Sequence, residues 1–354
     1  MCAINYGTRI RSAESNSDAF PVYGGGGRTF GWGSYNREDQ CVVSRFAMSP
    51  ECVRYVPGKF FLNDSGLTVE ASRHDVDQGY LNCYLLGHQR EIYALGRGCA
   101  QKNLKIEDFK GLLISLPTLD EQKKIVEKLN YICELIAKRK EQLAKLNQLV
   151  KSRFVEMFGD LVVNDKGWGL VVLGNVCDVR DGTHASPKYY DDGYPLMTSK
   201  NFTNGAVDFA GARLISKADF DEINRRSRVD VGDIVMPMIG TIGHPVIIST
   251  NREFAIKNVA LIKFTSESPL NVFVKHVLES NCFQRTVEGV NRGNTQKFIA
   301  LGDIRGFRFP LPPLSLQREF AAFVAEVDKS EFAVRKRLEK ARQLYRAKLQ
   351  EYFG

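Results

Sequence analysis

The residues of this sequence that could carry chemistry are not spaced for catalysis or metal binding. Its five histidines show no metal-ligand spacing and its eight cysteines form no CxxC pair. Asp108, Glu121 and Lys123 only faintly resemble a nuclease D…ExK set, and Glu121 is explained by its place at a helix start. No Walker A motif and no NPPF- or DPPY-like amino-methyltransferase motif occurs. The sequence therefore predicts no catalytic residue and no metal site.

Basic and amide side chains, in contrast, gather in patterns suited to DNA. The pattern RGxxQK occurs twice, at residues 97–102 and 292–297. Arginine and lysine suit guanine, asparagine and glutamine suit adenine, and any of them can contact phosphate. The candidate DNA-binding residues are Thr8, Arg9, Arg11, Arg28, Arg97, Gln101 and Lys102 in the first half, and Arg180, Thr183, His184, Lys200, Asn201, Arg292, Asn294, Gln296 and Lys297 in the second. The alternative for each residue is a solvated loop side chain, and for RGxxQK a turn that packs a globule onto its helix.

Charge and composition are compatible with a nucleic-acid partner. The 354 residues carry a net charge of +8, with an isoelectric point of about 9.0, which favours a polyanionic partner or a basic solvated surface. No apolar run is long enough to span a membrane and no signal peptide is evident. The scattered cysteines favour a reducing compartment, so a cytoplasmic location is expected.

The elements that must position these residues are set by an internal repeat. Residues 116–159 align without a gap with residues 311–354, from LPxLxxQ at the start to FG at the end. Each copy has proline near its start and glycine at its end. No proline or glycine interrupts the run between them, which predicts one long helix per copy. About 39 residues at about 1.5 Å each give a rod of roughly 58 Å.

Each predicted helix carries an apolar seam with heptad-like spacing. In the first copy it comprises Ile125, Leu129, Ile132, Ile136, Leu143, Leu146 and Val150, and in the second Phe320, Val324, Val327, Glu331, Leu338, Ala341 and Tyr345. A long amphipathic helix needs a partner in water, and the other copy is the obvious one. Because the chain runs globule, helix, globule, helix, the pair is expected to be antiparallel and pseudo-twofold.

The two globules repeat as well. Residues 1–115 and 160–310 both show short apolar segments broken by turn residues, which predicts an α/β (α+β) fold with many loops. Cys2, Ile4, Gly7 and Thr8 match Cys177, Val179, Gly182 and Thr183. The second globule is preceded by the segment 160–175, which has no counterpart before the first. We therefore expect the first globule to lack an opening strand unless another segment replaces it.

The ordered set of repeated motifs resembles the specificity (S) subunits of type I restriction–modification systems, the HsdS family. LPxLxxQ, the terminal FG and RGxxQK carry the resemblance, which extends over essentially the whole chain. It implies target recognition domains at 1–115 and 160–310, and spacer helices at 116–159 and 311–354 that form an antiparallel coiled coil.

The resemblance also implies a function. Each globule would read one half of a bipartite site on double-stranded DNA, while the helices set the gap and dock two methylation subunits. S-adenosylmethionine and ATP would bind only to partner subunits, the methylation and restriction subunits of the full complex. Two alternatives stay open at this point: a structural scaffold with a dimerising helix pair, and a degenerate or phase-variant S subunit.

Overall fold

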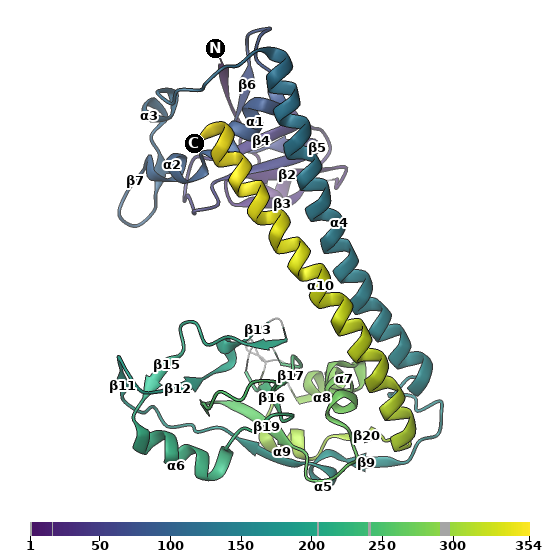
Figure 1. The fold of residues 1–354 in the computed structure, drawn as a ribbon. Coiled ribbons are helices and arrows are strands. Elements are labelled where there is room, and N and C mark those ends of the chain that lie inside the picture. The colour runs from purple at the N-terminus through teal and green to yellow at the C-terminus, as the bar shows by residue number, and fades with distance from the viewer. Residues whose placement is uncertain (1, 16, 204, 240–241, 291–297) are drawn as a thin grey trace. The chain divides into compact units, whose positions relative to one another are not determined.

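A computed structural model of the chain describes residues 2–15, 17–203, 205–239, 242–290 and 298–354. It divides into two compact units, each containing a globule and a stretch of both long helices (Figure 1). Unit 1 comprises Met1–Leu143 and Phe332–Gly354, and unit 2 comprises Ala144–Glu331. The two spacer helices are therefore shared between the units, whereas the sequence predicted them as segments separate from the globules.

Unit 1 is built on a six-stranded sheet of order β1-β6-β4-β5-β2-β3, in which only the β2–β5 pair is parallel. A small hairpin, β7–β8, lies outside this sheet. The strands of unit 1 are β1 Cys2–Tyr6, β2 Phe20–Gly24, β3 Gly27–Trp32, β4 Arg37–Ser44, β5 Val53–Leu62, β6 Gly66–Ala71, β7 Gly96–Arg97 and β8 Asn103–Leu104. Its helices are the 3-10 helix η1 Ser12–Glu14, and α1 Gln78–Gly87, α2 Gln89–Ala94, α3 Ile106–Lys110 and the first part of α4 Leu119–Phe158.

Unit 2 holds two four-stranded sheets, β10-β19-β16-β17 and β11-β15-β12-β18, and two small ones, β13–β14 and β20–β9. Its strands are β9 Leu170–Val172, β10 Asp178–Asp181, β11 Tyr189–Tyr190, β12 Tyr194–Met197, β13 Phe202–Thr203, β14 Ala206–Val207, β15 Arg213–Ile215, β16 Ile234–Pro237, β17 Val246–Ile247, β18 Ala255–Ile256, β19 Val259–Lys263 and β20 Arg308–Pro310. Its helices are α5 Leu173–Val176, η2 Ser199–Asn201, α6 Lys217–Ser227, α7 Asn271–Glu279, α8 Asn281–Val290, α9 Leu301–Arg305 and the first part of α10 Leu314–Phe353.

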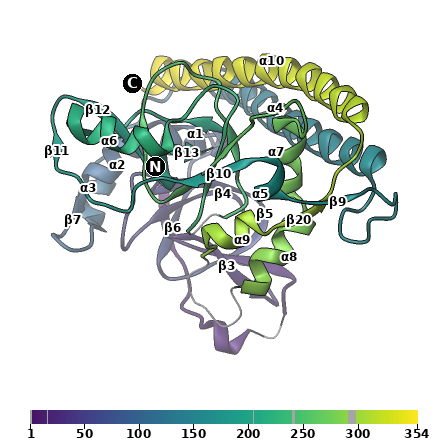
Figure 2. The same cartoon turned by 90° about the horizontal axis from the view of Figure 1, so that it is seen from below.

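The long helices confirm the repeat. The 40-residue helices α4 and α10 have bounds that differ by 195 residues at both ends, and so do the short helices α3 and α9. The predicted seams are largely buried, most completely at Leu129, Ile132, Val150, Phe320, Val324, Val327 and Leu338. In unit 2, Arg153 near the end of α4 pairs with Glu319 near the start of α10 at 2.8 Å, so the helices are antiparallel there. Figure 2 shows the two helices running along each other.

Each long helix begins in one unit and ends against the core of the other. At the start of α4 the buried Gln122 accepts a hydrogen bond from the backbone N–H of Asp77, and at the start of α10 Gln317 accepts one from Leu270, both at 2.8 Å. Each Gln Nε2 also donates to the carbonyl of the proline five residues earlier, at 2.9 and 2.8 Å. The repeated glutamine thus ties each helix start to its globule.

The repeated FG ends of the helices have equivalent roles. The ring of Phe158, at the end of α4, lies with its centroid 5.0 Å from that of Phe273 on α7. The ring of Phe353, at the end of α10, lies 5.1 Å from Tyr80 on α1. Because α1 and α7 are the first helices after the equivalent strands β6 and β19, each terminal phenylalanine closes the core beside the same element of its unit.

Candidate nucleic-acid interface

The loops that follow β1 and β10 are equivalent and carry several candidate residues. A Cβ on Gly7 would lie 1.9 Å from a backbone oxygen of Asn63, and one on Gly182 would lie 2.4 Å from a backbone oxygen in β18. Only glycine fits such close backbone approaches. The next residues, Thr8 and Thr183, donate their backbone N–H to carbonyls of Leu62 and of β18, both at 2.9 Å. The repeated Gly-Thr therefore fixes where each following loop leaves its sheet.

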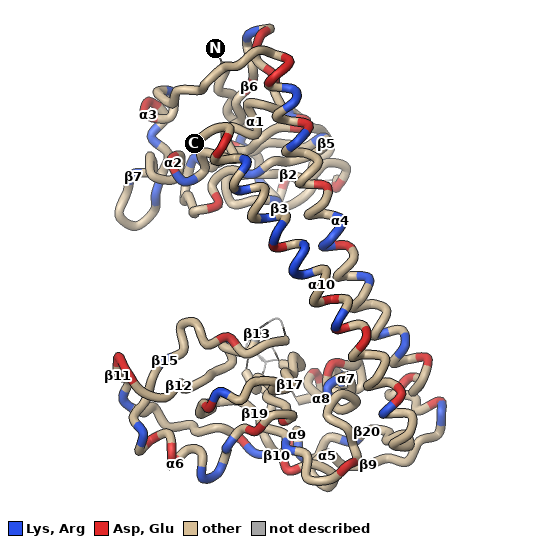
Figure 3. The backbone as a smooth tube through the Cα atoms, viewed as in Figure 1, with Lys and Arg blue, Asp and Glu red and all other residues tan. Residues whose placement is uncertain are grey.

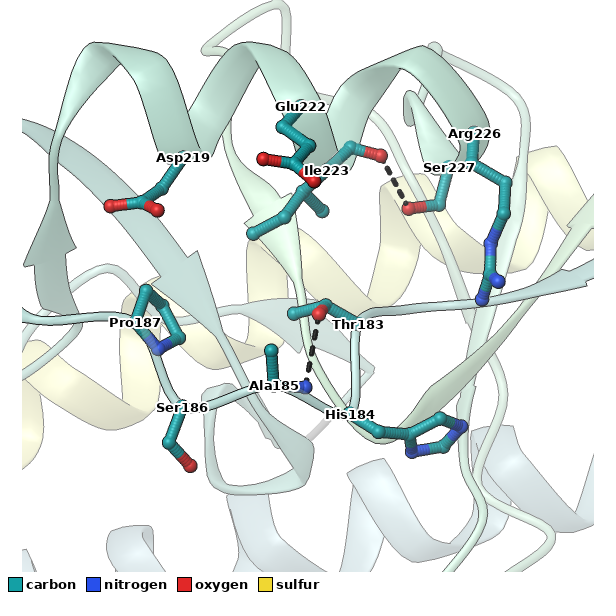
Figure 4. A pocket seen from close by; sticks show the side chains of 10 residues that line it. All are labelled: Thr183, His184, Ala185, Ser186, Pro187, Asp219, Glu222, Ile223, Arg226 and Ser227. Atoms are coloured by element: carbon teal, nitrogen blue, oxygen red, sulfur yellow. Dashed lines mark hydrogen bonds between the residues drawn. The ribbon is translucent and has the colours of Figure 1, made fainter.

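In unit 2 this loop borders a pocket of about 370 Å³. The pocket lies between residues 183–187 and one face of α6 (Figure 4). His184 and Arg226 lie at one end of it, whereas Asp219 and Glu222 contribute negative charge farther along the helix. The arrangement favours an anionic group at the His184 end only.

Both nitrogens of the His184 ring have an acceptor. Nδ1 lies 2.8 Å from Asn258 Oδ1, and Nε2 lies 2.8 Å from Asp181 Oδ2. Because only the imidazolium form can donate from both nitrogens, these hydrogen bonds, that to Asn258 first, raise the pKa of His184 above its ordinary value of 6.5. Asp181 also pairs with Arg226. The carboxylate of Asp181 therefore holds two cationic side chains together, His184 from the loop and Arg226 from α6.

We expect His184 to titrate above pH 6.5 and Asp181→Asn to lower that pKa, because the variant loses the charged acceptor. A raised pKa favours the charged form in the folded state. The resulting contribution to stability is thus complete below about pH 6.5 and is lost as pH rises through the raised pKa. NMR titration measures the pKa, with His184→Gln assigning the signal. A His184 pKa at or below 6.5 in the unmodified protein would contradict this interpretation.

Two other candidates in unit 2 already use their polar atoms within the protein. The Arg180 guanidinium donates to Asp178 from Nε at 2.9 Å and to the carbonyl of Arg226 from Nη1 at 2.8 Å. Asn201 is 8% exposed, and its side chain accepts from the Thr198 N–H at 2.9 Å. This geometry indicates that both residues hold loops in place. Lys200, beside Asn201, is exposed.

In unit 1 the first RGxxQK segment forms the turn of the β7–β8 hairpin. Gly98 has φ of +122°, and a Cβ there would lie 2.1 Å from the Gln101 carbonyl oxygen, so the turn requires glycine. Arg97 Nη2 lies 3.5 Å from Asp108 Oδ2, and the Lys102 ammonium lies 4.2 Å from the ring centre of Tyr93. Gln101 is exposed at the tip. The hairpin thus brings these three candidates together.

The remaining candidates are dispersed. Arg9 and Arg11 are exposed in the loop after β1, close to Thr8 in sequence, and Arg28 is exposed on the edge strand β3. Arg292, Asn294, Gln296 and Lys297 lie outside the described residues. DNA contact by the exposed candidates stays a prediction.

The comparison with known families settles which family these units represent. The sequence profile of the type I restriction modification DNA specificity domain matches residues 52–148 and 165–341, more than half of the chain. The chain belongs to this family. The profile matches twice: the first match ends at residue 148 within α4, and the second begins at residue 165, after α4. Two matches are what the internal repeat requires.

Individual relatives are distant. The chain is 23% identical over 294 residues to the EcoBI specificity subunit of Escherichia coli, covering 75% of this chain and 62% of that protein. It is 23% identical over 298 residues to the MjaVIII specificity subunit of Methanocaldococcus jannaschii, covering 77% and 69%. The chain thus spans less than two thirds of the length of the first of these relatives.

Solved structures share the fold. The S subunit of a type I restriction-modification system from M. genitalium aligns over 100% of this chain and 94% of that one, with a TM-score of 0.60 and 16% identity. A second structure was solved to explain complex assembly and conformational transition of the type I R-M system. It aligns over 100% of this chain and 97% of that one, with a TM-score of 0.53 and 18% identity. This chain therefore shares its fold with these two solved structures.

Several cations that lie over aromatic rings were not predicted from the sequence. Lys188 lies 5.5 Å from the ring centre of Tyr190, and Arg213 lies 4.6 Å from that of Tyr189. In unit 1, Arg45 lies over two exposed aromatic rings, at 4.5 and 4.8 Å. The KYY triplet at Lys188–Tyr190 was the available signal, since basic residues beside exposed aromatics suit nucleic acid.

No metal or membrane feature is found in the part of the chain that the structure describes. Among these residues no group of three His, Cys, Asp or Glu could hold a metal ion. None of the described helices is long and apolar enough to cross a bilayer.

Proposed function

We propose that this chain is a non-catalytic subunit that recognises a specific DNA sequence in a type I restriction–modification complex. The observation that carries the proposal is the double match to the DNA specificity domain, one match in each half of the chain. The net charge of +8 supports a polyanionic partner. In the cytoplasm, the subunit would hold two methylation subunits and, in the full complex, restriction subunits.

In this proposal each globule reads one half of a bipartite site. The loops after β1 and β10 and the β7–β8 hairpin offer basic and amide groups for base edges and phosphates. Lys and Arg residues are interspersed with Asp and Glu residues along both long helices (Figure 3), a pattern that suits contacts with protein subunits as well as with water. S-adenosylmethionine and ATP would bind to the partner subunits.

DNA binding by the complex with its methylation subunits is expected to weaken steeply with salt. Phosphate neutralisation releases counterions, and about six phosphate contacts would lower affinity about 10³-fold between about 50 and 200 mM salt. Arg9→Gln with Arg11→Gln should reduce the slope of log K against log salt by about 2. Fluorescence anisotropy with a labelled duplex measures both quantities.

A charge-matched control separates local contact from net charge. Lys123→Gln with Lys124→Gln removes the same charge from the exposed first turns of α4. The slope should stay within about 0.5 of that of the unmodified complex, since neither lysine is among the residues proposed to contact DNA. An assembled complex whose affinity did not change with salt would count against DNA binding and favour the protein scaffold.

The helices would set the gap between the half-sites. Deleting seven residues at matching positions of α4 and α10 preserves the heptad seam. Each helix becomes shorter by about 10.5 Å. We expect the gap to shorten by about three base pairs, at about 3.4 Å each, with both half-sites unchanged. Selection of bound sequences from a random duplex pool measures the gap, and altered half-site bases with an unchanged gap would refute this role of the helices.

A further inference from the structure

The strands β4 and β16 are equivalent, and the chain leaves both of them in the same way. They are third in the orders β1-β6-β4 and β10-β19-β16, in which all neighbours are antiparallel. Just after β4, the carbonyl of Arg45 accepts a hydrogen bond from Leu104 N–H at 2.8 Å. Just after β16, the carbonyl of Met238 accepts one from Ile299 N–H at 3.0 Å. Leu104 and Ile299 are related by the repeat's offset of 195 residues, so Arg45 and Met238 are equivalent.

The next residues, Phe46 and Ile239, are therefore equivalent too, and both are apolar and exposed. Phe46 is 45% exposed and Ile239 is 37% exposed. A single exposed apolar residue needs no explanation. Its repetition at an equivalent position, in globules whose sequences otherwise diverge, indicates a shared role on the surface.

In unit 1 the backbone holds Phe46 in this exposed position. Ala47, directly after it, has φ of +47°, a conformation that residues other than glycine rarely adopt. Ala47 N–H donates to Asn103 Oδ1 at 3.2 Å, and Met48 N–H donates to the carbonyl of Lys102 at 2.8 Å. Such strained conformations persist where the surroundings enforce them, and they cluster at functional sites.

Phe46 is linked by contacts to both segments of unit 1 that are proposed to read DNA. The hydrogen bonds to Asn103 and Lys102 attach its turn to the β7–β8 hairpin. The Arg45 guanidinium carbon lies 4.8 Å from the ring centre of Phe46 and 4.5 Å from that of Tyr6, the last residue before the loop after β1. Among the described residues no carboxylate pairs with Arg45, whose Nη1 donates to a backbone carbonyl at 2.8 Å. The charge beside Phe46 therefore favours a polyanion.

In unit 2, Ile239 lies at the sheet end that carries the loop after β10. Pro237, the last residue of β16, pairs with Val259, and the carbonyl of Val259 accepts a hydrogen bond from Gly182 N–H at 3.0 Å. Ile239 also pairs with Phe298, which is 48% exposed. An exposed apolar side chain thus stands beside a loop proposed to read DNA in this unit as well.

We propose that Phe46 and Ile239 are wedges that insert between neighbouring base pairs, one in each half of the DNA site. The proposal rests on the proposed function and adds to it a deformation of the DNA. Phenylalanine and isoleucine are among the side chains that partly unstack a base step and kink a duplex. Pyrimidine–purine steps unstack most easily, so each wedge would favour such a step without a hydrogen bond to a base.

The test uses the complex with its methylation subunits and the duplex selected from the random pool. Each base pair in turn carries a fluorescent analogue, 2-aminopurine for adenine or pyrrolocytosine for cytosine, whose emission rises when stacking is lost. We expect emission to rise about threefold or more at one step in each half-site. Phe46→Ala should abolish the rise in one half-site and Ile239→Ala that in the other. Each variant should weaken binding about tenfold, as the loss of one stacked contact does.

Two controls separate a wedge from other exposed apolar groups. Phe332→Ala changes a phenylalanine of unit 1 that is 70% exposed on α10, and it should keep both rises in emission. Phe46→Leu should also keep both, because leucine can serve as a wedge. Loss of a rise in Phe332→Ala, or equal losses in Phe46→Leu and Phe46→Ala, would count against insertion.

The remaining outcomes distinguish the wedges from DNA recognition itself. Binding of the duplex, measured by anisotropy, without a rise at any base pair would overturn the wedges and leave the proposed function intact. If the unmodified complex bound no duplex, the proposed function would fail and the wedges with it. If Phe46→Ala instead weakened assembly with the methylation subunits on gel filtration and left emission unchanged, Phe46 would be a protein contact and the proposal would be wrong.

Discussion

Replacing Phe158 with alanine is expected to destabilise unit 2 by about 3–5 kcal/mol, the usual cost of truncating a buried phenylalanine. Phe158 is 1% exposed, and its ring centroid lies 5.0 Å from Phe273 and 5.4 Å from Phe320. The variant would leave a cavity where the end of α4, the start of α10 and α7 meet. The expected result is loss of the packing that fixes both long helices in unit 2.

Tryptophan fluorescence during urea unfolding can follow unit 2 alone. The chain has two tryptophans, one in each unit, and Trp168 Nε1 donates to the Phe158 carbonyl at 3.0 Å. In a Trp32→Phe background, Trp168 reports unit 2. Val155→Ala, on the same helix at 56% exposure, is the control and should change stability by less than about 0.5 kcal/mol. If both variants had equal effects, Phe158 would not be a core residue.

The second large effect is expected at the repeated glutamines. Gln122→Leu leaves the N–H of Asp77 and the carbonyls of Asp75 and Pro117 without their buried partner. Each such group costs about 1–3 kcal/mol, so we expect a loss of about 3 kcal/mol in unit 1. Gln317→Leu should have a similar effect on unit 2.

The two glutamine variants should act locally, because distant sites behave independently. Trp32 fluorescence should report the loss for Gln122→Leu, and Trp168 fluorescence the loss for Gln317→Leu. Gln148 and Gln343 are repeated at the same offset but exposed, so their leucine variants are matched controls that should cost less than about 0.5 kcal/mol. A loss spread equally over both units would contradict the anchoring role.

Features set by local periodicity were predictable from the sequence. The offset between the repeats placed α4 and α10, and heptad spacing identified buried seam residues such as Leu129 and Phe320. The sheets of the globules were not predictable in detail, because strands such as β11 and β18 contain only two residues, and tertiary pairing rather than local pattern defines them.

The candidate site was predictable only in part. The repeated Gly-Thr after β1 and β10 marked the loops correctly as equivalent, since a duplicated glycine reflects a duplicated backbone constraint. Residue type alone could not distinguish a free side chain from an engaged one. Arg180 and Asn201 have suitable chemistry for DNA, yet Asp178 and the Thr198 N–H already occupy their polar atoms.

In the proposed function, the two units of one chain each read half of a DNA site. Methylome sequencing of cells that express this chain with its methylation subunits tests it most directly. We expect a methylated motif in two parts, separated by a gap of fixed length and unspecified sequence. A single continuous motif, or a palindrome built from one half-site, would contradict it, as would the absence of any motif when the complex is assembled.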